Sequence, residues 1–378
     1  MDGEQRRAAA AFVGHGSPMN ALERNRFTDG WRALATHIPE PWAVVVISAH
    51  WYTNATAVTA MARPRTIHDF YGFPDELFAF DYPAPGAPGV AEEVADVVKP
   101  RWVGLDRDSW GLDHGTWSVL AHMFPSADVP VVQLSINALE PLDYHVDIGR
   151  RLAGLRDSNV LVLGSGNVVH NLPSIAWDQP DGAFDWNRRF ADAAREVLHD
   201  APGDVLRLVE HPDFERAVPT PDHFIPLLYV AALAAEAGEP AVRLIDGSAY
   251  GSLSMACYGV GVSGPLAAAS VAANQVGNVA VSIPLIIVLG IATGSSAAAG
   301  LEPSPTTLAI VGGVVLLAAL LLLMPPIRSR ARVLWLDFAA RGLPRLLDVL
   351  VKPRKLAEAA GGILLQAAAL VFCFYASL

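Results

Sequence analysis

Short apolar runs alternate with longer amphipathic stretches along residues 1–260. Four runs have the length and the β-branched content of buried strands, at residues 11–13, 43–48, 129–134 and 160–164. Five other stretches have helical periodicity, at residues 31–37, 89–98, 144–155, 186–199 and 224–235. Alternation of this kind predicts an α/β fold in which helices flank a central, mostly parallel sheet.

The pattern changes near residue 261, where charged residues almost disappear. Between residues 261 and 327 only Glu302 is charged. Residues 266–291 and 306–324 are long and apolar enough to cross a bilayer, and residues 361–378 reach the lower limit of that length. We therefore expect a catalytic domain at residues 1–260, followed at residues 261–378 by a partial, all-α membrane region with these three transmembrane spans.

Charge separates the two parts further and predicts an orientation. Residues 261–378 have a net charge of +4, which leaves −15 for residues 1–260 because the whole chain has −11. An acidic first domain argues against nucleic acid as a partner, since phosphate binding needs a basic surface. All eight basic residues of the second part lie between residues 328 and 355, and the positive-inside rule assigns that linker to the cytoplasm. Counting back two spans predicts a cytoplasmic catalytic domain held at a lipid bilayer.

Histidines in loop-like segments are the candidate chemical groups of the first domain. Six of the eleven histidines have such a setting: His15, His50, His68, His114, His170 and His223. His15, His50 and His170 come shortly after predicted strand ends, where α/β folds form their sites. Neutral imidazole is a common ligand of zinc and non-haem iron, and no CxxC pair accompanies these histidines. The pattern favours a catalytic metal site over a structural one, but it does not decide the reaction.

Six segments together resemble one enzyme family. They are FVGHGSPMNAL, VVISAHWYT, TIHDFYGFP, LDHGTWSVL, VLGSGNVVHNL and PTPDHFIPLLYV, in this order along residues 9–260. This set is similar to the class III extradiol ring-cleavage dioxygenases, in particular to the bacterial 4,5-DOPA dioxygenase branch. The resemblance implies a metal-dependent enzyme that uses dioxygen to open the ring of a small aromatic vicinal diol of the catechol or DOPA type.

The resemblance also implies roles for five histidines. His15, His50 and His223 would bind the metal. His170 would lie beside the metal, either as a further ligand or as the general base, and His114 would be an acid/base or substrate-binding group. Related enzymes hold Fe(II) with two histidines and one carboxylate. Here the resemblance gives a histidine, His223, at the third ligand position. The metal therefore stays open between Fe(II) and Zn(II).

Two alternatives to a membrane-tethered dioxygenase follow from the same sequence. The histidines could activate a metal-bound water, which would make the first domain a zinc-dependent hydrolase. Residues 264–378 also resemble part of the flippase-like membrane region found with lysylphosphatidylglycerol synthases. The chain could then be a membrane lipid-transport or regulatory protein with a vestigial enzyme domain.

Overall fold

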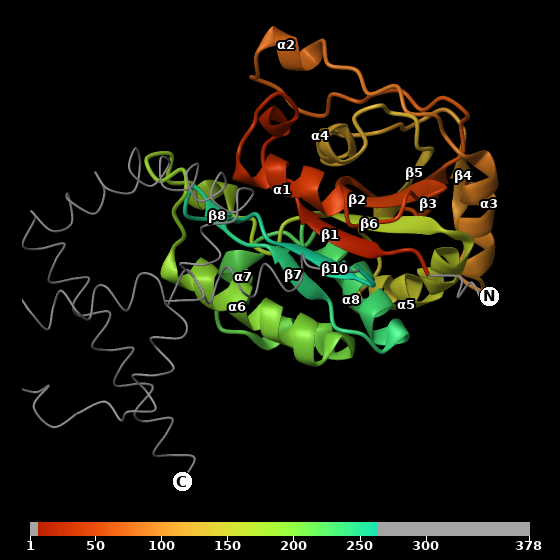
Figure 1. The fold of residues 1–378 in the computed structure, drawn as a ribbon. Helices are drawn as coiled ribbons and strands as arrows, with labels where there is room; N and C mark the ends of the chain where they lie inside the picture. Colours follow the sequence, from red (N-terminus) through yellow and green to blue (C-terminus); the bar gives the residue numbers. More distant parts are fainter. Residues whose placement is uncertain (1–6, 263–378) are drawn as a thin grey trace, which may run out of the picture. The chain divides into compact units, whose positions relative to one another are not determined.

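A computed structural model describes residues 7–262 of the chain. Its centre is an eight-stranded sheet with the strand order β4-β3-β5-β2-β6-β1-β10-β7 (Figure 1). The strand bounds are β1 Ala10–Gly14, β2 Ala43–Thr53, β3 Ala57–Thr59, β4 Gly104–Asp106, β5 Val131–Asn137, β6 Val160–Gly166, β7 Val242–Ile245 and β10 Cys257–Val260. A separate two-stranded sheet pairs β8 Ser248–Ala249 with β9 Leu253–Ser254.

The inner strands β5, β2, β6 and β1 all run in the same direction. In their register Val44 faces Leu161, and Ala10 faces Val162. Strands β3 and β10 join this parallel core in the antiparallel sense, next to β5 and β1. The prediction of a central, mostly parallel sheet is confirmed, and the carboxyl ends of β1, β2 and β6 lie along one edge.

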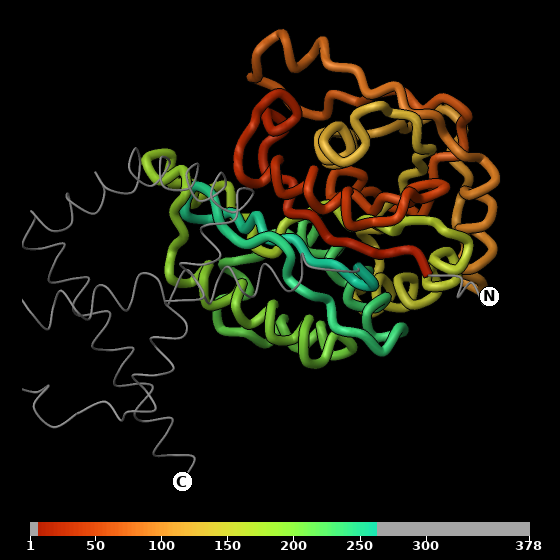
Figure 2. The backbone as a smooth tube through the Cα atoms, in the orientation of Figure 1, coloured from red at the N-terminus to blue at the C-terminus, as the bar shows by residue number. Residues whose placement is uncertain are grey.

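Helices cover both faces of the sheet (Figures 1 and 2). The α-helices are α1 Arg26–Ala35, α2 Asp75–Phe78, α3 Pro88–Val97, α4 His114–Met123, α5 Leu142–Arg151, α6 Asp185–Asp200, α7 Phe214–Ala217 and α8 Ile225–Ala237. The 3-10 helices are η1 Pro18–Ala21, η2 Leu152–Ser158, η3 Leu172–Ser174 and η4 Pro202–Glu210. Helices α1 and α4 contribute to the core on one face, and α3, α5, α6 and α8 to the core on the other.

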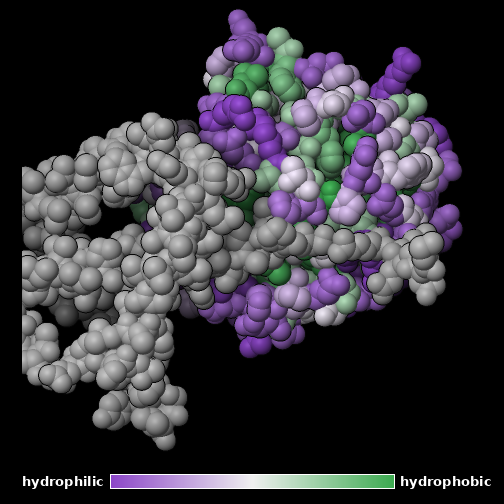
Figure 3. Space-filling view, viewed as in Figure 1, coloured by the Kyte–Doolittle hydropathy of each residue, from purple (hydrophilic) through white to green (hydrophobic). Residues whose placement is uncertain are grey.

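Alternate residues of each inner strand build the two cores. In β2, Val45 and Ile47 pack into one core, while Val44 and Val46 pack into the other. A strand covered on both faces needs apolar residues at nearly every position, which explains the uninterrupted apolar run of residues 43–47. Hydrophilic residues cover much of the outer surface seen in Figure 3, as expected for helices that bury only one side.

Several elements differ from the sequence-based predictions, and the short strands β3, β4, β7, β8, β9 and β10 were not predicted. The strand expected at residues 43–48 continues to Thr53, so His50 lies inside β2 and does not follow its end. Helix α4 was not predicted, because nearly all of its residues are buried and it has no polar side that would reveal a helical period. The remaining predicted strands and helices agree with the structure to within a few residues.

The membrane spans predicted at residues 266–291, 306–324 and 361–378 lie outside the described residues. Within residues 7–262, no helix is both long enough and apolar enough to cross a membrane. The membrane region and its lysylphosphatidylglycerol synthase-like resemblance therefore stay predictions.

Candidate metal centre and active site

Three histidines reach one buried region from three separate segments. His15 directly follows β1, His50 lies in β2, and His223 lies just before α8. The ring centroids are 5.0 Å apart for His15 and His50, 5.1 Å for His50 and His223, and 5.2 Å for His15 and His223. The three side chains that the resemblance assigns to a metal thus form a nearly equilateral triangle of rings.

The other two candidate histidines join the same cluster. His114 is the first residue of α4, and its ring centroid lies 3.8 Å from that of His50. His170 follows β6, and its ring stacks on His223 at 3.5 Å with an interplanar angle of 6°. His68 has a different setting, because its Nε2 donates to the carbonyl of Phe80 at 2.9 Å.

An irregularity in β2 turns His50 toward this cluster. The pairing of β2 with β5 shifts register between Ile47 and Tyr52, and a bulge of this kind re-aims side chains near sites. The hydroxyl of Ser48 accepts from the backbone N–H of His50 at 3.3 Å and donates to the buried carboxyl of Asp113 at 2.7 Å. The irregular part of the strand is therefore held by side-chain hydrogen bonds.

The surroundings of His15 select one tautomer of its ring. Its Nδ1 lies 3.0 Å from Oγ of Ser165. That hydroxyl donates its proton to the carbonyl of Gly115, at 2.5 Å. Ser165 must therefore accept from Nδ1–H of His15, and Nε2 of the ring is left with a free lone pair.

Carboxylates fix the same tautomer in the other two rings of the triangle. Nδ1 of His50 lies 3.1 Å from Oδ2 of Asp69, and Nδ1 of His223 contacts Oδ2 of Asp222. An ionised carboxylate accepts but does not donate, so each Nδ1 carries the proton. Nε2 is therefore the nitrogen that each neutral ring leaves free for another partner, and the Nε2 atoms of His15 and His50 lie 3.1 Å apart.

This geometry fits a metal ion held by three imidazoles. Two lone pairs facing each other at 3.1 Å repel unless a cation or a proton lies between them. Rings that bind one tetrahedral ion at about 2.0–2.1 Å have centres about 5 Å apart, which agrees with the triangle. The ligand atoms of two other sets, His15–His50–His114 and His170–Asp222–His223, also lie within 4.8 Å of one another. The ring centres of His50 and His114 are only 3.8 Å apart and those of His170 and His223 only 3.5 Å, which is too short for two imidazoles on one tetrahedral ion.

Burial keeps most of these imidazoles neutral. It lowers the pKa of His15 well below its usual value, that of His223 to about 4 and that of His170 to about 2. The pKa of His114 is also lowered, by burial and then by the neighbouring His50. For His50, burial is outweighed by the hydrogen bond to Asp69 and the nearby charge of Asp113, so its pKa is raised instead. Neutral imidazole is the form that binds metals, so the other four rings of the cluster have the metal-binding form at neutral pH.

The carboxylates behind the cluster stay ionised. Burial opposes the ionisation of Asp69, but hydrogen bonds from His114 and His50 outweigh it and hold the pKa of Asp69 well below its usual range. The hydrogen bond from His223 has the same effect on the pKa of Asp222. Carboxylates behind metal-binding histidines orient the rings and raise their basicity.

Sequence reasoning missed several residues that hold the site together. Asp69, Asp113 and Ser165 do not stand out because their roles depend on contacts across 45 to 150 residues. The signal for Asp69 in the sequence is its place in TIHDFYGFP, directly after the candidate residue His68. The ring of Phe70, from the same segment, meets His114 edge-on with centroids 5.6 Å apart.

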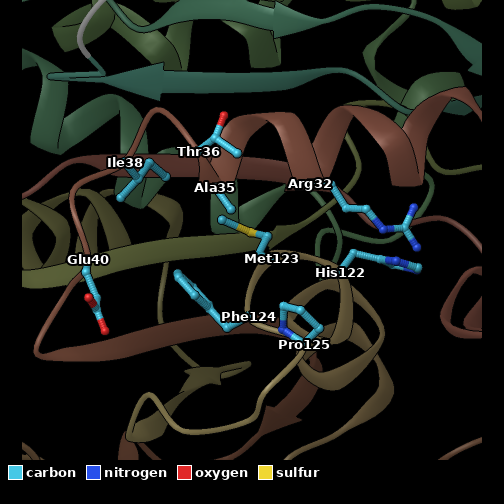
Figure 4. A pocket seen from close by; sticks show the side chains of 9 residues that line it. All are labelled: Arg32, Ala35, Thr36, Ile38, Glu40, His122, Met123, Phe124 and Pro125. Atoms are coloured by element: carbon cyan, nitrogen blue, oxygen red, sulfur yellow. The ribbon is translucent and has the colours of Figure 1, made fainter.

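A surface hollow of about 410 Å³ between α1 and α4 lies apart from this chemistry (Figure 4). Its lining is mostly apolar, with Ile38, Met123 and Phe124 among its residues. Arg32 and His122 lie side by side at one end. None of the five clustered histidines lines this hollow, so the histidine cluster is the candidate active site.

The family model of the catalytic LigB subunit of aromatic ring-opening dioxygenases matches residues 10–259. The chain belongs to this family. It is 44% identical over 259 residues to a 4,5-DOPA dioxygenase extradiol of Escherichia coli K12, covering 68% of this chain and 95% of that protein. It is 35% identical over 235 residues to the 4,5-DOPA dioxygenase extradiol of Beta vulgaris, covering 60% and 86%.

A solved structure supports the same assignment. The crystal structure of an uncharacterized protein from Escherichia coli K12 matches with a TM-score of 0.59 and 38% identity, covering 67% of this chain and all of that one. The prediction that the LigB-type domain is an extradiol ring-cleavage dioxygenase is confirmed, and the metal dependence of that class agrees with the histidine cluster.

Proposed function

We propose that the LigB-type domain opens the ring of a catechol- or DOPA-type diol with dioxygen, at a metal held by His15, His50 and His223. The observation that carries this proposal is the convergence of three imidazoles whose Nδ1 protons are all committed to fixed acceptors. Each Nε2 lone pair is therefore available to one ion. The reaction class comes from the family, and the residue assignment, which the resemblance implies, is supported by this geometry.

Iron is the metal that suits the reaction. Imidazole ligands suit both Fe(II) and Zn(II), but Zn(II) has no redox chemistry. An Fe(II) ion held by His15, His50 and His223 would supply the redox chemistry that lets the diol give its electrons to dioxygen. We therefore propose Fe(II) as the working metal and the aromatic diol and dioxygen as the two substrates.

His114 and His170 have the right setting to handle the protons of the diol. His114 donates its Nδ1 proton to Asp69, so its Nε2 is free to accept a proton from a hydroxyl group. His170 is neutral and stacks on His223. Imidazole lone pairs lie in the ring plane, so two parallel rings 3.5 Å apart do not both point at one ion. This supports His170 as a base beside the metal.

The direct test is an oxygen-uptake assay on the full-length chain loaded with Fe(II) under anaerobic conditions. We expect DOPA or another catechol to be consumed with one equivalent of dioxygen, giving a yellow ring-opened product. The His50→Ala variant supplies the inactive control. No oxygen uptake across a broad panel of catechols, by enzyme with verified stoichiometric iron, would refute the proposed substrate class.

The membrane part of the proposal rests on sequence alone. We infer from the predicted spans and the basic linker that residues 261–378 tether the enzyme to a bilayer, with the catalytic domain in the cytoplasm. Fractionation tests this directly: the chain should sediment with membranes, resist extraction by high salt and be released by detergent. Recovery in the supernatant without detergent would contradict the tether.

A further inference from the structure

We propose that Asp69 is a positioning residue that sets two groups at once, the metal-binding tautomer of His50 and the orientation of His114. This inference rests on the proposed function for its catalytic half. Its metal-binding half stands on the geometry of the histidine cluster.

One carboxylate serves both rings. Oδ2 of Asp69 lies 3.1 Å from Nδ1 of His50 and 3.0 Å from Nδ1 of His114. Oδ1 lies 2.9 Å from the same Nδ1 of His114 and accepts the backbone N–H of His114 at 3.0 Å. Asp69 therefore holds a proposed metal ligand and a proposed proton-handling group in one fixed arrangement, with their ring centres 3.8 Å apart.

The loop that carries Asp69 is anchored by the two residues that precede Asp69. The N–H of Ile67 donates to the carbonyl of Leu112 at 2.7 Å, and Nε1 of Trp117 donates to the carbonyl of Ile67 at 2.9 Å. His68 bonds to the carbonyl of Phe80. A carboxylate on a loop fixed in this way can position its partners, because its own position does not depend on them.

The two oxygens of Asp69 accept different sets of hydrogen bonds, so replacing one oxygen with an amide NH2 is informative. In Asp69→Asn, the amide oxygen is best placed on the Oδ1 side, where it accepts two bonds from His114. The amide NH2 then takes the Oδ2 position and faces Nδ1–H of His50, which loses its acceptor, whereas Nδ1–H of His114 keeps Oδ1 as its acceptor. His50 must change tautomer to relieve this contact, and its proton then moves to the nitrogen that would bind the metal.

Asp69→Ala removes the acceptor from both rings. His50 again loses the group that fixes its tautomer, and His114 loses its side-chain and backbone bonds to the carboxylate. The alanine variant should therefore impair metal binding and catalysis, whereas the asparagine variant should mainly impair metal binding. A residue with only a general structural role would not separate the two effects in this way.

The experiment measures Co(II) affinity by competition with a chromogenic chelator, and kcat and KM at saturating Fe(II), on the full-length chain. We expect Co(II) affinity to fall about 10- to 100-fold in both variants. We expect kcat at saturating metal to fall at least about 10-fold in Asp69→Ala but to stay within about 3-fold of wild type in Asp69→Asn. Asp81→Asn, an exposed carboxylate that contacts Thr66 instead of a histidine, is the matched control and should change neither quantity.

The possible outcomes distinguish the metal-binding role of Asp69 from its catalytic role. Unchanged Co(II) affinity in both Asp69 variants, with melting temperatures equal to wild type, would overturn the inference. Equal losses of kcat in both variants, accompanied by lower melting temperatures, would also overturn it. If the wild-type chain turns over no catechol while Asp69→Asn still weakens Co(II) binding, the proposed function fails and the role of Asp69 at the metal stands.

Discussion

Gly166 connects the packing of the sheet to the proposed metal ligand His223, and replacing it with alanine tests that connection. Gly166 ends β6. A Cβ atom at this position would lie 2.2 Å from the carbonyl oxygen of His223 and 3.1 Å from its carbonyl carbon. Ordinary contact begins near 3.4 Å, so the His223 backbone has to move by about 1 Å.

The cost can be worked from the contacts that this movement disturbs. The His223 carbonyl accepts a hydrogen bond from the N–H of Asn167 at 2.9 Å and cannot turn away without losing that bond. A lost hydrogen bond costs about 1 kcal/mol and overpacking about 1–3 kcal/mol, so we expect Gly166→Ala to destabilise the fold by about 2–4 kcal/mol. Metal sites tolerate ligand shifts of only about 0.2 Å, so metal affinity should fall as well.

Thermal unfolding and a Co(II) competition assay on the full-length chain measure the two effects. Gly89→Ala is the matched control, because a Cβ there meets nothing within 4 Å and the residue lies in α3. That variant should be unchanged or slightly more stable, since alanine favours a helix over glycine. A Gly166→Ala variant with wild-type melting temperature and wild-type Co(II) affinity would refute the link between β6 packing and the site.

Three further predictions concern pH, ligand identity and metal removal. Burial lowers the pKa of His145 to about 4, so the unfolded chain takes up a proton below about pH 6.5 while the folded chain does not. The free energy of unfolding should fall by roughly 3 kcal/mol as the pH falls from 6.5 to 4. In His145→Asn, the free energy of unfolding measured with urea should depend less on pH in this range; the same pH dependence as wild type would contradict the role of His145. His223→Ala should lose stoichiometric Co(II) while His114→Ala keeps it and loses kcat, and the reverse pattern in metal analysis would move the site to His15, His50 and His114. Chelation should lower the melting temperature of wild type, because an ion at about 1,000 times its Kd adds about 4 kcal/mol, but a similar drop in His223→Ala would show that the chelator acts elsewhere.

The parts of the fold that sequence patterns predicted are those with one unambiguous period. The inner strands are covered on both faces, so β1, β2 and β6 contain continuous apolar runs that are easy to find. Helices α5 and α6 each have one buried side and show the helical period clearly. Helix α4 is buried nearly all round, and strands β7 and β10 are only four residues each, so local pattern carried too little information for them.

The candidate site was likewise predictable from the sequence only in part. The sequence pattern selected six histidines in loop-like segments, and the family resemblance reduced them to His15, His50, His114, His170 and His223. The groups that decide what these histidines do could not be selected, because they are set by long-range contacts. Ser165 lies 150 residues from His15, and the bulge that turns His50 inward is a property of strand pairing.

The hydrogen bonds behind the rings make metal binding a property of the folded sheet. His15 takes its acceptor from β6, the strand parallel to β1, and His50 takes its acceptor from the loop that carries Asp69. Only His223 has its acceptor next to it in the chain. In the unfolded chain the rings are free to adopt either tautomer and are not held together. Folding therefore supplies both the proximity and the tautomers, and it brings Nε2 of His15 and Nε2 of His50 to 3.1 Å, where a cation or a proton between them removes the repulsion of their lone pairs. The same interactions that order this edge of the sheet thus prepare it for a cation.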